Sequence, residues 1–196
     1  MKVSEWSKIA EGWSLAAGRW STALGERGDL RTSPRTHRIL RHGTFLMDMT
    51  WVTGRIAVGG GIWTAENMAQ VARAGVTHIL DMQIEFDDTP LAVPHGITVL
   101  WNPIDDDFQP KSPEVFQHGV DFALEALDEE GSKLFVHCAA GVHRAPMMTL
   151  AILCSLSWKL GDALQLIEAR RPVVDFADVY VNSVKEFLQQ QVKAGK

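Results

Sequence analysis

Hydrophobic side chains near the N-terminus repeat at the spacing of an α-helix. When residues 4–24 are wound at about 3.6 residues per turn, one stripe contains Trp6, Ile9, Trp13, Ala17, Trp20 and Leu24. The pattern predicts an amphipathic helix, which Gly12 and Gly18 weaken. Such a stripe usually buries its apolar area against the domain that follows it, and a partner protein or a membrane surface is the alternative.

The next segment, residues 26–42, is basic. Its acidic residues are Glu26 and Asp29, and its arginines are Arg27, Arg31, Arg35, Arg38 and Arg41. Pro34 would interrupt a helix here, so we interpret the segment as a solvated linker. The alternative is a surface that attracts acidic or phosphorylated partners. Residues 1–43 are therefore predicted to form an arm, and residues 44–196 to form the folded domain.

From about residue 45 onward, the hydrophobic pattern alternates between short strands and longer helices. Strands are predicted at 54–60, 76–82, 96–103 and 133–137, and helices at 64–75, 112–130, 145–157, 161–171 and 178–192. Thr64 and Ser112 are suitable N-caps for the first two helices. Because strands alternate with helices, we expect an α/β fold, with a mostly parallel sheet of about four to five strands and helices on both faces.

The composition is that of a globular domain, with 46% hydrophobic and 22% charged residues among 196. A net charge of -5 argues against a nucleic-acid binder, and we expect a monomer that acts on a small or protein-bound ligand. Two cysteines, Cys138 and Cys154, are too few for a disulfide framework or a zinc site, which indicates a reducing compartment. No run approaches the roughly 18 apolar residues of a membrane span, so we expect a cytoplasmic protein.

One short segment has the pattern of an anion-binding loop. A buried strand is followed by Cys138, five further residues, Arg144 and an apolar helix, so the loop lies where ligands gather in open α/β sheets. Gly141 and the small alanines let the backbone curl until successive N–H groups converge on one point, and Arg144 can grip two phosphate oxygens. The predicted phosphate-binding residues are Ala139, Ala140, Gly141, Val142, His143 and Arg144.

Cys138 would lie at the floor of this loop, where the helix dipole, the N–H groups and Arg144 favour the thiolate. A thiolate that faces phosphorus is a nucleophile, and its attack would form a phosphocysteine. The departing oxygen needs a proton, so an acid should approach from another loop. The candidates are Asp105, Asp106 and Asp107.

These residues resemble the motif of the cysteine-dependent protein phosphatases, which is His-Cys, five residues, Arg. The resemblance covers about residues 51–188, and the short domain looks like the small dual-specificity group. It implies hydrolysis of phosphomonoesters without a metal or another cofactor. It also implies that Cys138 is the nucleophile and that Arg144 binds phosphate.

The same resemblance ranks the candidate acids. In many family members the acid lies 32 residues before the cysteine, which selects Asp106, with Asp107 as the second choice. Asp105 would only tune or position its neighbour. His137, directly before the cysteine, would be a buried residue that hydrogen-bonds and steadies the loop.

Ala145 departs from the family pattern, because most members carry Ser or Thr after the arginine and use its hydroxyl to break down the phosphocysteine. The run "HCAAGVHRAP" is most similar to the phosphatases of regenerating liver, which also have Ala-Pro there and turn over slowly. Slow turnover is therefore one expectation. The alternative is a pseudophosphatase, a phosphate-binding or partner-binding module. His143 departs as well, since its position is normally small.

The expected substrate is a phosphorylated protein or a small phosphomonoester. An inositol phosphate or phosphoinositide is less favoured, because Ala139, Ala140 and Val142 supply no positive charge inside the loop. Arg170 and Arg171 follow a predicted helix, and they either reach the pocket mouth or are ordinary surface charge.

Overall fold

The computed structural model describes residues 46–195. The predicted N-terminal helix and basic linker lie outside the described residues, and the boundary between arm and domain stays a prediction. Within the described part of the chain, no helix is both long and apolar enough to cross a bilayer.

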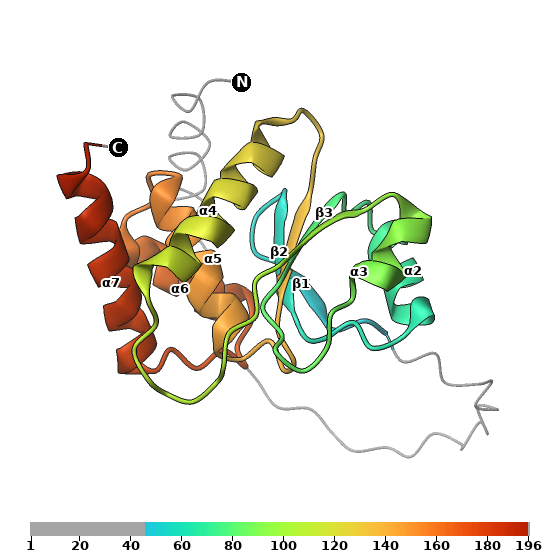
Figure 1. Ribbon diagram of the computed structural model, residues 1–196, viewed down its shortest axis with the longest axis horizontal. Helices are drawn as coiled ribbons and strands as arrows, with labels where there is room; N and C mark the ends of the chain where they lie inside the picture. The colour runs from blue at the N-terminus through green and yellow to red at the C-terminus, as the bar shows by residue number, and fades with distance from the viewer. Residues whose placement is uncertain (1–45, 196) are drawn as a thin grey trace, which may run out of the picture.

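Five strands form one sheet in the order β1-β2-β5-β3-β4 (Figure 1). Their bounds are Met49–Trp51 for β1, Ile56–Gly59 for β2, His78–Asp81 for β3, Thr98–Trp101 for β4 and Leu134–His137 for β5. β1 pairs antiparallel with β2, and all the other neighbours are parallel. The central strand β5 is buried at every position, which explains why its sequence is apolar up to His137.

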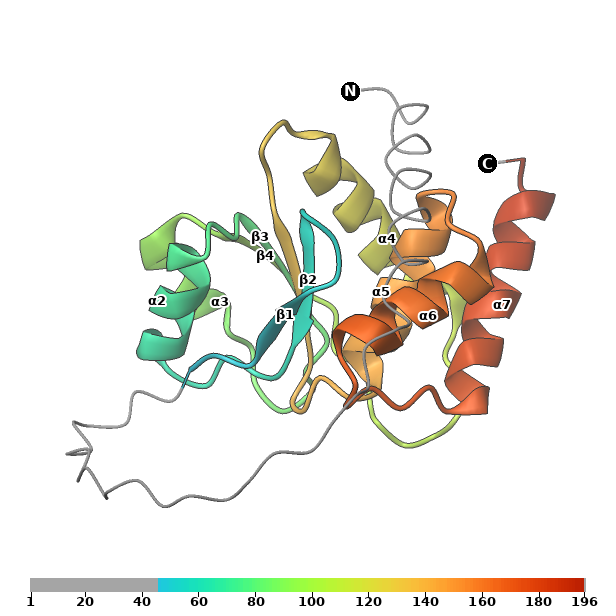
Figure 2. The ribbon, with the colours of Figure 1, turned by 180° about the vertical axis from the view of Figure 1, so that it is seen from behind.

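Helices cover both faces of this sheet, as Figures 1 and 2 show. Their bounds are Ala65–Arg73 for α2, Thr89–Ala92 for α3, Val93–His95 for the 3-10 helix η3, Pro113–Asp128 for α4, Arg144–Ser155 for α5, Leu160–Arg170 for α6 and Asp178–Lys193 for α7. In β5, Phe135 packs on the face covered by α2, whereas Leu134 and Val136 pack on the face covered by α4 to α7. The predicted α/β fold is confirmed.

Three short elements escaped the sequence analysis, namely β1, α3 and the 3-10 helix η3. β1 is a half-buried edge strand of 3 residues, too short to show an alternating pattern. α3 has 4 residues and begins with Thr89 and Pro90, so it lacks a helical repeat of apolar positions. The long helices lie close to their predicted ranges, because their apolar faces cover several turns.

The sheet brings three strand ends together. Gly59 and Asp81 are the register partners of His137, so β2, β5 and β3 end side by side. The segments that leave these ends therefore meet at one edge of the sheet, which is where Cys138 begins the loop before α5.

Candidate active site

Residues 138–144, which we call the phosphate loop, curl around the sulfur of Cys138. Cys138 is buried, and the Gly141 N–H donates to its Sγ at 3.3 Å. Gly141 has a φ of +65°, and a Cβ at this position would lie 2.5 Å from the carbonyl carbon and oxygen of Gly59. Glycine is therefore required here by both its backbone conformation and its contact with β2.

Arg171 supports the loop from behind. Its Nε donates to the Gly141 carbonyl at 2.8 Å, and its Nη2 donates to the Ala140 carbonyl at 3.3 Å. A bidentate ion pair with Asp48 holds the guanidinium, with one N···O distance of 2.6 Å. Because a trans peptide points its carbonyl and its N–H in opposite directions, these contacts turn the following N–H groups toward the inside of the loop.

Arg144 presents one edge of its guanidinium to the same space. Its Nη1 and Nη2 bind the two carboxylate oxygens of Glu85 at 3.0 Å and 2.7 Å, and Nη1 also donates to the Ile104 carbonyl at 3.0 Å. The buried Nε has no hydrogen-bond partner among the described residues. The Nε and Nη2 edge therefore retains two N–H donors for two oxygens of an anion.

Glu85 was not predicted as a site residue. It follows the carboxyl end of β3, and its hydrogen bond with Arg144 holds the pKa of its carboxyl below its usual range. The only sequence signal was an acid in a segment that leaves a buried strand, at the edge where the phosphate loop was already expected.

Asp106 reaches the phosphate loop from the segment 104–111, which we call the acid segment. Its Oδ2 lies 3.0 Å from His143 Nδ1 and 3.8 Å from Arg144 Nε. Its Oδ1 accepts a hydrogen bond from the Tyr180 hydroxyl at 2.9 Å. The structure thus brings Asp106, His143 and Arg144 together.

The neighbouring aspartates have different surroundings. Asp107 accepts the Gln109 N–H at 3.0 Å and forms an ion pair with Lys111. The hydrogen bond from Lys111 lowers the pKa of Asp107, which makes this carboxyl a poorer proton donor near neutral pH. Asp105 is exposed.

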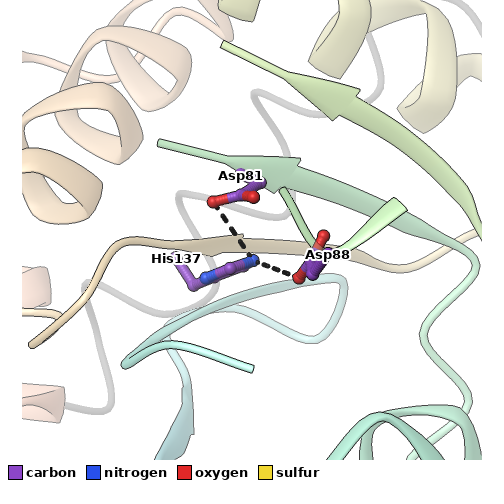
Figure 3. Close-up of side chains that lie close together, drawn as sticks. All are labelled: Asp81, Asp88 and His137. Atoms are coloured by element: carbon purple, nitrogen blue, oxygen red, sulfur yellow. Dashed lines mark ion pairs between the residues drawn. The ribbon is translucent and has the colours of Figure 1, made fainter. Parts of the chain in front are cut away.

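Behind Cys138, the buried side chain of His137 lies between two carboxylates (Figure 3). Its Nε2 is 2.9 Å from Asp88 Oδ2 and 3.7 Å from Asp81 Oδ1. Burial raises the pKa of Asp81 to about 7, although its Oδ1 accepts the Gln83 N–H at 2.8 Å. Neither ring nitrogen of His137 has a hydrogen-bond partner among the described residues, so its contacts with the two carboxylates are electrostatic.

Residues 61–190 match the family described as "Dual specificity phosphatase, catalytic domain". The chain belongs to the dual specificity phosphatases. This match confirms the predicted membership of the small dual-specificity group. The domain is that of an enzyme that hydrolyses phosphoric monoesters. The likeness of the loop to the phosphatases of regenerating liver stays a prediction.

The phosphatase is similar to dual specificity protein phosphatase 26 of Mus musculus, at 26% identity over 94% of this chain and 90% of that protein. It is 37% identical to 75 residues of dual specificity protein phosphatase 5 of Rattus norvegicus, or 38% of this chain, and spans only 19% of that protein's length. The solved structure of PTPMT1 in complex with PI(5)P shares the fold, with a TM-score of 0.67 at 19% identity, and the match covers 76% of this chain and 99% of that one.

Among the described residues of the phosphatase, Asp81, Asp88 and His137 are the group best placed to hold a metal ion. Their potential ligand atoms all lie within 4.8 Å of one another, and all three side chains are fully buried. Their shortest contact is 2.9 Å between His137 Nε2 and Asp88 Oδ2, and neither atom has a hydrogen-bond partner among the described residues.

We predict that Asp81→Asn reduces the pH dependence of stability of the phosphatase. A folded-state pKa of about 7, raised from 3.8, means that Asp81 is most compatible with folding below about pH 4, and that this contribution is lost as pH rises toward 7. The wild type should therefore lose about 2–4 kcal/mol relative to the variant between about pH 4 and pH 8. Urea unfolding across that range measures this difference.

The exposed Asp162→Asn is the matched control for the urea series, and its stability should follow the wild-type pH curve. Parallel pH curves for the wild type and Asp81→Asn would mean that Asp81 keeps its charge in the folded protein.

Proposed function

We propose that this protein hydrolyses phosphomonoesters of phosphorylated proteins through a phosphocysteine intermediate. The observation that carries the proposal is the phosphate loop itself. The Gly141 N–H points at Cys138 Sγ, 3.3 Å away, and Arg144 keeps an N–H edge free beside it. Such a site can hold the equatorial oxygens of a phosphoryl group while the sulfur faces phosphorus.

In the first step, the Cys138 thiolate attacks phosphorus and the bond from phosphorus to the ester oxygen breaks. The N–H groups of residues 139–144 and the side chain of Arg144 bind the phosphoryl oxygens, whose charge they stabilise. Asp106 gives its proton to the departing oxygen, so that an alcohol or phenol leaves rather than an oxyanion. The contacts of Asp106 with the phosphate loop, at 3.0 Å and 3.8 Å, support this role over Asp107.

In the second step, water attacks the phosphorus of the phosphocysteine. The carboxylate of Asp106 takes a proton from this water, the bond between phosphorus and sulfur breaks, and inorganic phosphate leaves. The thiolate of Cys138 is restored. We assign a slow second step to this protein, because Ala145 provides no hydroxyl beside the sulfur and is itself fully buried.

Aromatic side chains from separate segments favour a protein substrate with an aryl phosphate. Phe108 is 51% exposed and packs edge-on against His143, with 5.0 Å between ring centroids. Trp63 and Phe86 form an exposed pair at 6.1 Å, and Phe86 adjoins the Arg144 partner Glu85. A phenyl ring that carries phosphate into the loop can pack against such side chains.

An inositol lipid is the second substrate class to weigh, since PTPMT1 has been solved in complex with PI(5)P. The interior positions of the phosphate loop in this chain are Ala139, Ala140 and Val142, which provide no cation for additional phosphate groups. We therefore favour a phosphorylated protein over an inositol lipid as the substrate.

The second candidate function is a module that binds phosphate or a phosphorylated partner without turning it over. Ala145 is the observation that favours it, because the hydroxyl that assists breakdown of a phosphocysteine is absent. We further propose that the protein is a cytoplasmic monomer.

Burial raises the pKa of Cys154 to about 11, so this thiol stays protonated and is a poor resolving partner for Cys138.

We predict that Cys138→Ser abolishes hydrolysis of an aryl phosphate, because serine lacks a thiolate-like nucleophile at neutral pH. Rapid mixing should show a burst of phenol from the wild type and none from the variant, while vanadate still binds both proteins. Cys154→Ser is the matched control and should retain the burst. Hydrolysis by pure Cys138→Ser protein would refute cysteine chemistry.

Ala145→Ser should raise the steady rate about tenfold while it leaves the burst amplitude near one per site, since the added hydroxyl assists the attack of water. The measurement compares the burst and steady phases of the two proteins. Absence of a burst and of turnover in both proteins would favour the binding module.

Asp106→Ala should slow an alkyl phosphate by about a hundredfold or more, and an aryl phosphate with a good leaving group much less. The reason is that a poor leaving group depends on the acid, whereas a good one departs unprotonated. Parallel measurements of kcat/KM on both substrates report the first step even when the second step limits turnover, and with Asp107→Ala as the matched variant they decide between the two aspartates. Equal losses on both substrates would exclude Asp106 as the acid.

A further inference from the structure

His143 occupies the last position of the phosphate loop before Arg144, and its ring bridges two other segments. On one side, its Nδ1 lies 3.0 Å from Asp106 Oδ2. On the other side, its Nε2 lies 3.6 Å from Asp175 Oδ2, and the Asp175 N–H donates to the Val142 carbonyl at 3.1 Å. The side chain of His143 is only 19% exposed, so both contacts are partly shielded from water.

The two oxygens of Asp106 have different partners, and this decides which one carries its proton. Tyr180 accepts the Phe108 N–H at 3.0 Å and donates its own hydroxyl proton to Asp106 Oδ1 at 2.9 Å. Burial raises the pKa of Tyr180 to about 12, so the hydroxyl keeps that proton. Oδ1 therefore accepts, and the proton that Asp106 can give away belongs on Oδ2, which faces His143.

A contact of 3.0 Å between Oδ2 and Nδ1 holds one proton. When Asp106 is protonated, its O–H donates to the ring nitrogen of His143. When Asp106 is ionised, Nδ1 must itself carry a proton: the neutral ring gives up its Nε2 proton and gains one at Nδ1 by exchange with water, and Nδ1–H then donates to the carboxylate. The pair therefore keeps the same geometry in both protonation states of Asp106. A group that acts first as a general acid and then as a general base needs such a fixed position.

We propose that His143 is a positioning residue for Asp106: it holds the acid over the phosphate loop in both of its protonation states. This inference rests on the proposed phosphatase function. In the first step the departing oxygen replaces Nδ1 as the acceptor of the Oδ2 proton, and in the second step Oδ2 takes a proton from water. His143 ends each turnover with the protons it had at the start.

Aromatic packing fixes the same arrangement from the side of the acid segment. Phe108 stacks on Tyr180 at 5.7 Å with an interplanar angle of 13°, and it packs edge-on against His143. Its φ of +55° is a left-handed conformation that a phenylalanine rarely adopts. Besides Asp106, the charged groups next to His143 are Asp175 and the adjoining Arg144, so the ring lies between one carboxylate from each of two segments.

The test is a double-mutant cycle with His143→Ala and Asp106→Ala, followed on an alkyl phosphate. His143→Ala alone should lower kcat about tenfold or more with little change in KM, because the acid loses its position and not its substrate. In the Asp106→Ala background, the same substitution should produce no further loss. His143→Asn should recover part of the activity, since its amide can donate to Asp106.

Two further measurements separate positioning from direct binding. Inhibition by vanadate should be equal in the wild type and His143→Ala, and the exposed His118→Ala should match the wild type throughout. A loss that persists in the Asp106→Ala background, together with weaker vanadate inhibition, would overturn the inference and assign His143 to the phosphate. A wild type with neither turnover nor vanadate binding would instead refute the proposed function.

Discussion

The site depends on the orientation of the peptide groups at positions 140 and 141. Arg171 binds both carbonyls, and the planarity of the peptide bond then directs the next N–H groups into the phosphate loop. Gly141 makes this possible because it accepts a positive φ where the loop passes within contact of Gly59. If these peptides rotated, carbonyl dipoles would face the inside of the loop, where they would repel an anion.

Buried charge connects this loop to the sheet. Arg171 pairs with Asp48, which precedes β1. Arg144 pairs with Glu85 and His137 with Asp88, and both of these carboxylates lie in the segment between β3 and α3. His137 and Asp88 are both fully buried, and removal of one member of such a pair typically costs about 3–5 kcal/mol, because the other charge is left without compensation. Asp48 and Glu85 are 57% and 41% exposed, so water weakens the other two pairs. Ion pairs therefore link the strand ends to the phosphate loop.

The sequence predicted those features that depend on local pattern. The parallel sheet, the long helices and the glycine-containing loop could be predicted from hydrophobic spacing and small residues. The local pattern left three aspartates open, and the resemblance to the cysteine-dependent phosphatases selected Asp106, which does lie at the loop. Glu85 and Arg171 could not be assigned this way, since their partners lie 59 and 30 residues away. Their roles follow from how strand ends align, which a one-dimensional pattern does not record.

Tyr180 is the single tyrosine of the chain, and its place in α7 has a consequence for how the protein is made. Its hydroxyl holds Asp106 and Phe108, and Ser183 on the same helix accepts the Lys111 N–H at 3.0 Å. Synthesis proceeds from the N-terminus, so the phosphate loop leaves the ribosome before α7 does. A nascent chain that ends before α7 has Cys138 and Arg144 but lacks the side chain that anchors Asp106 and Phe108, so the arrangement around the phosphate loop is complete only when α7 has docked.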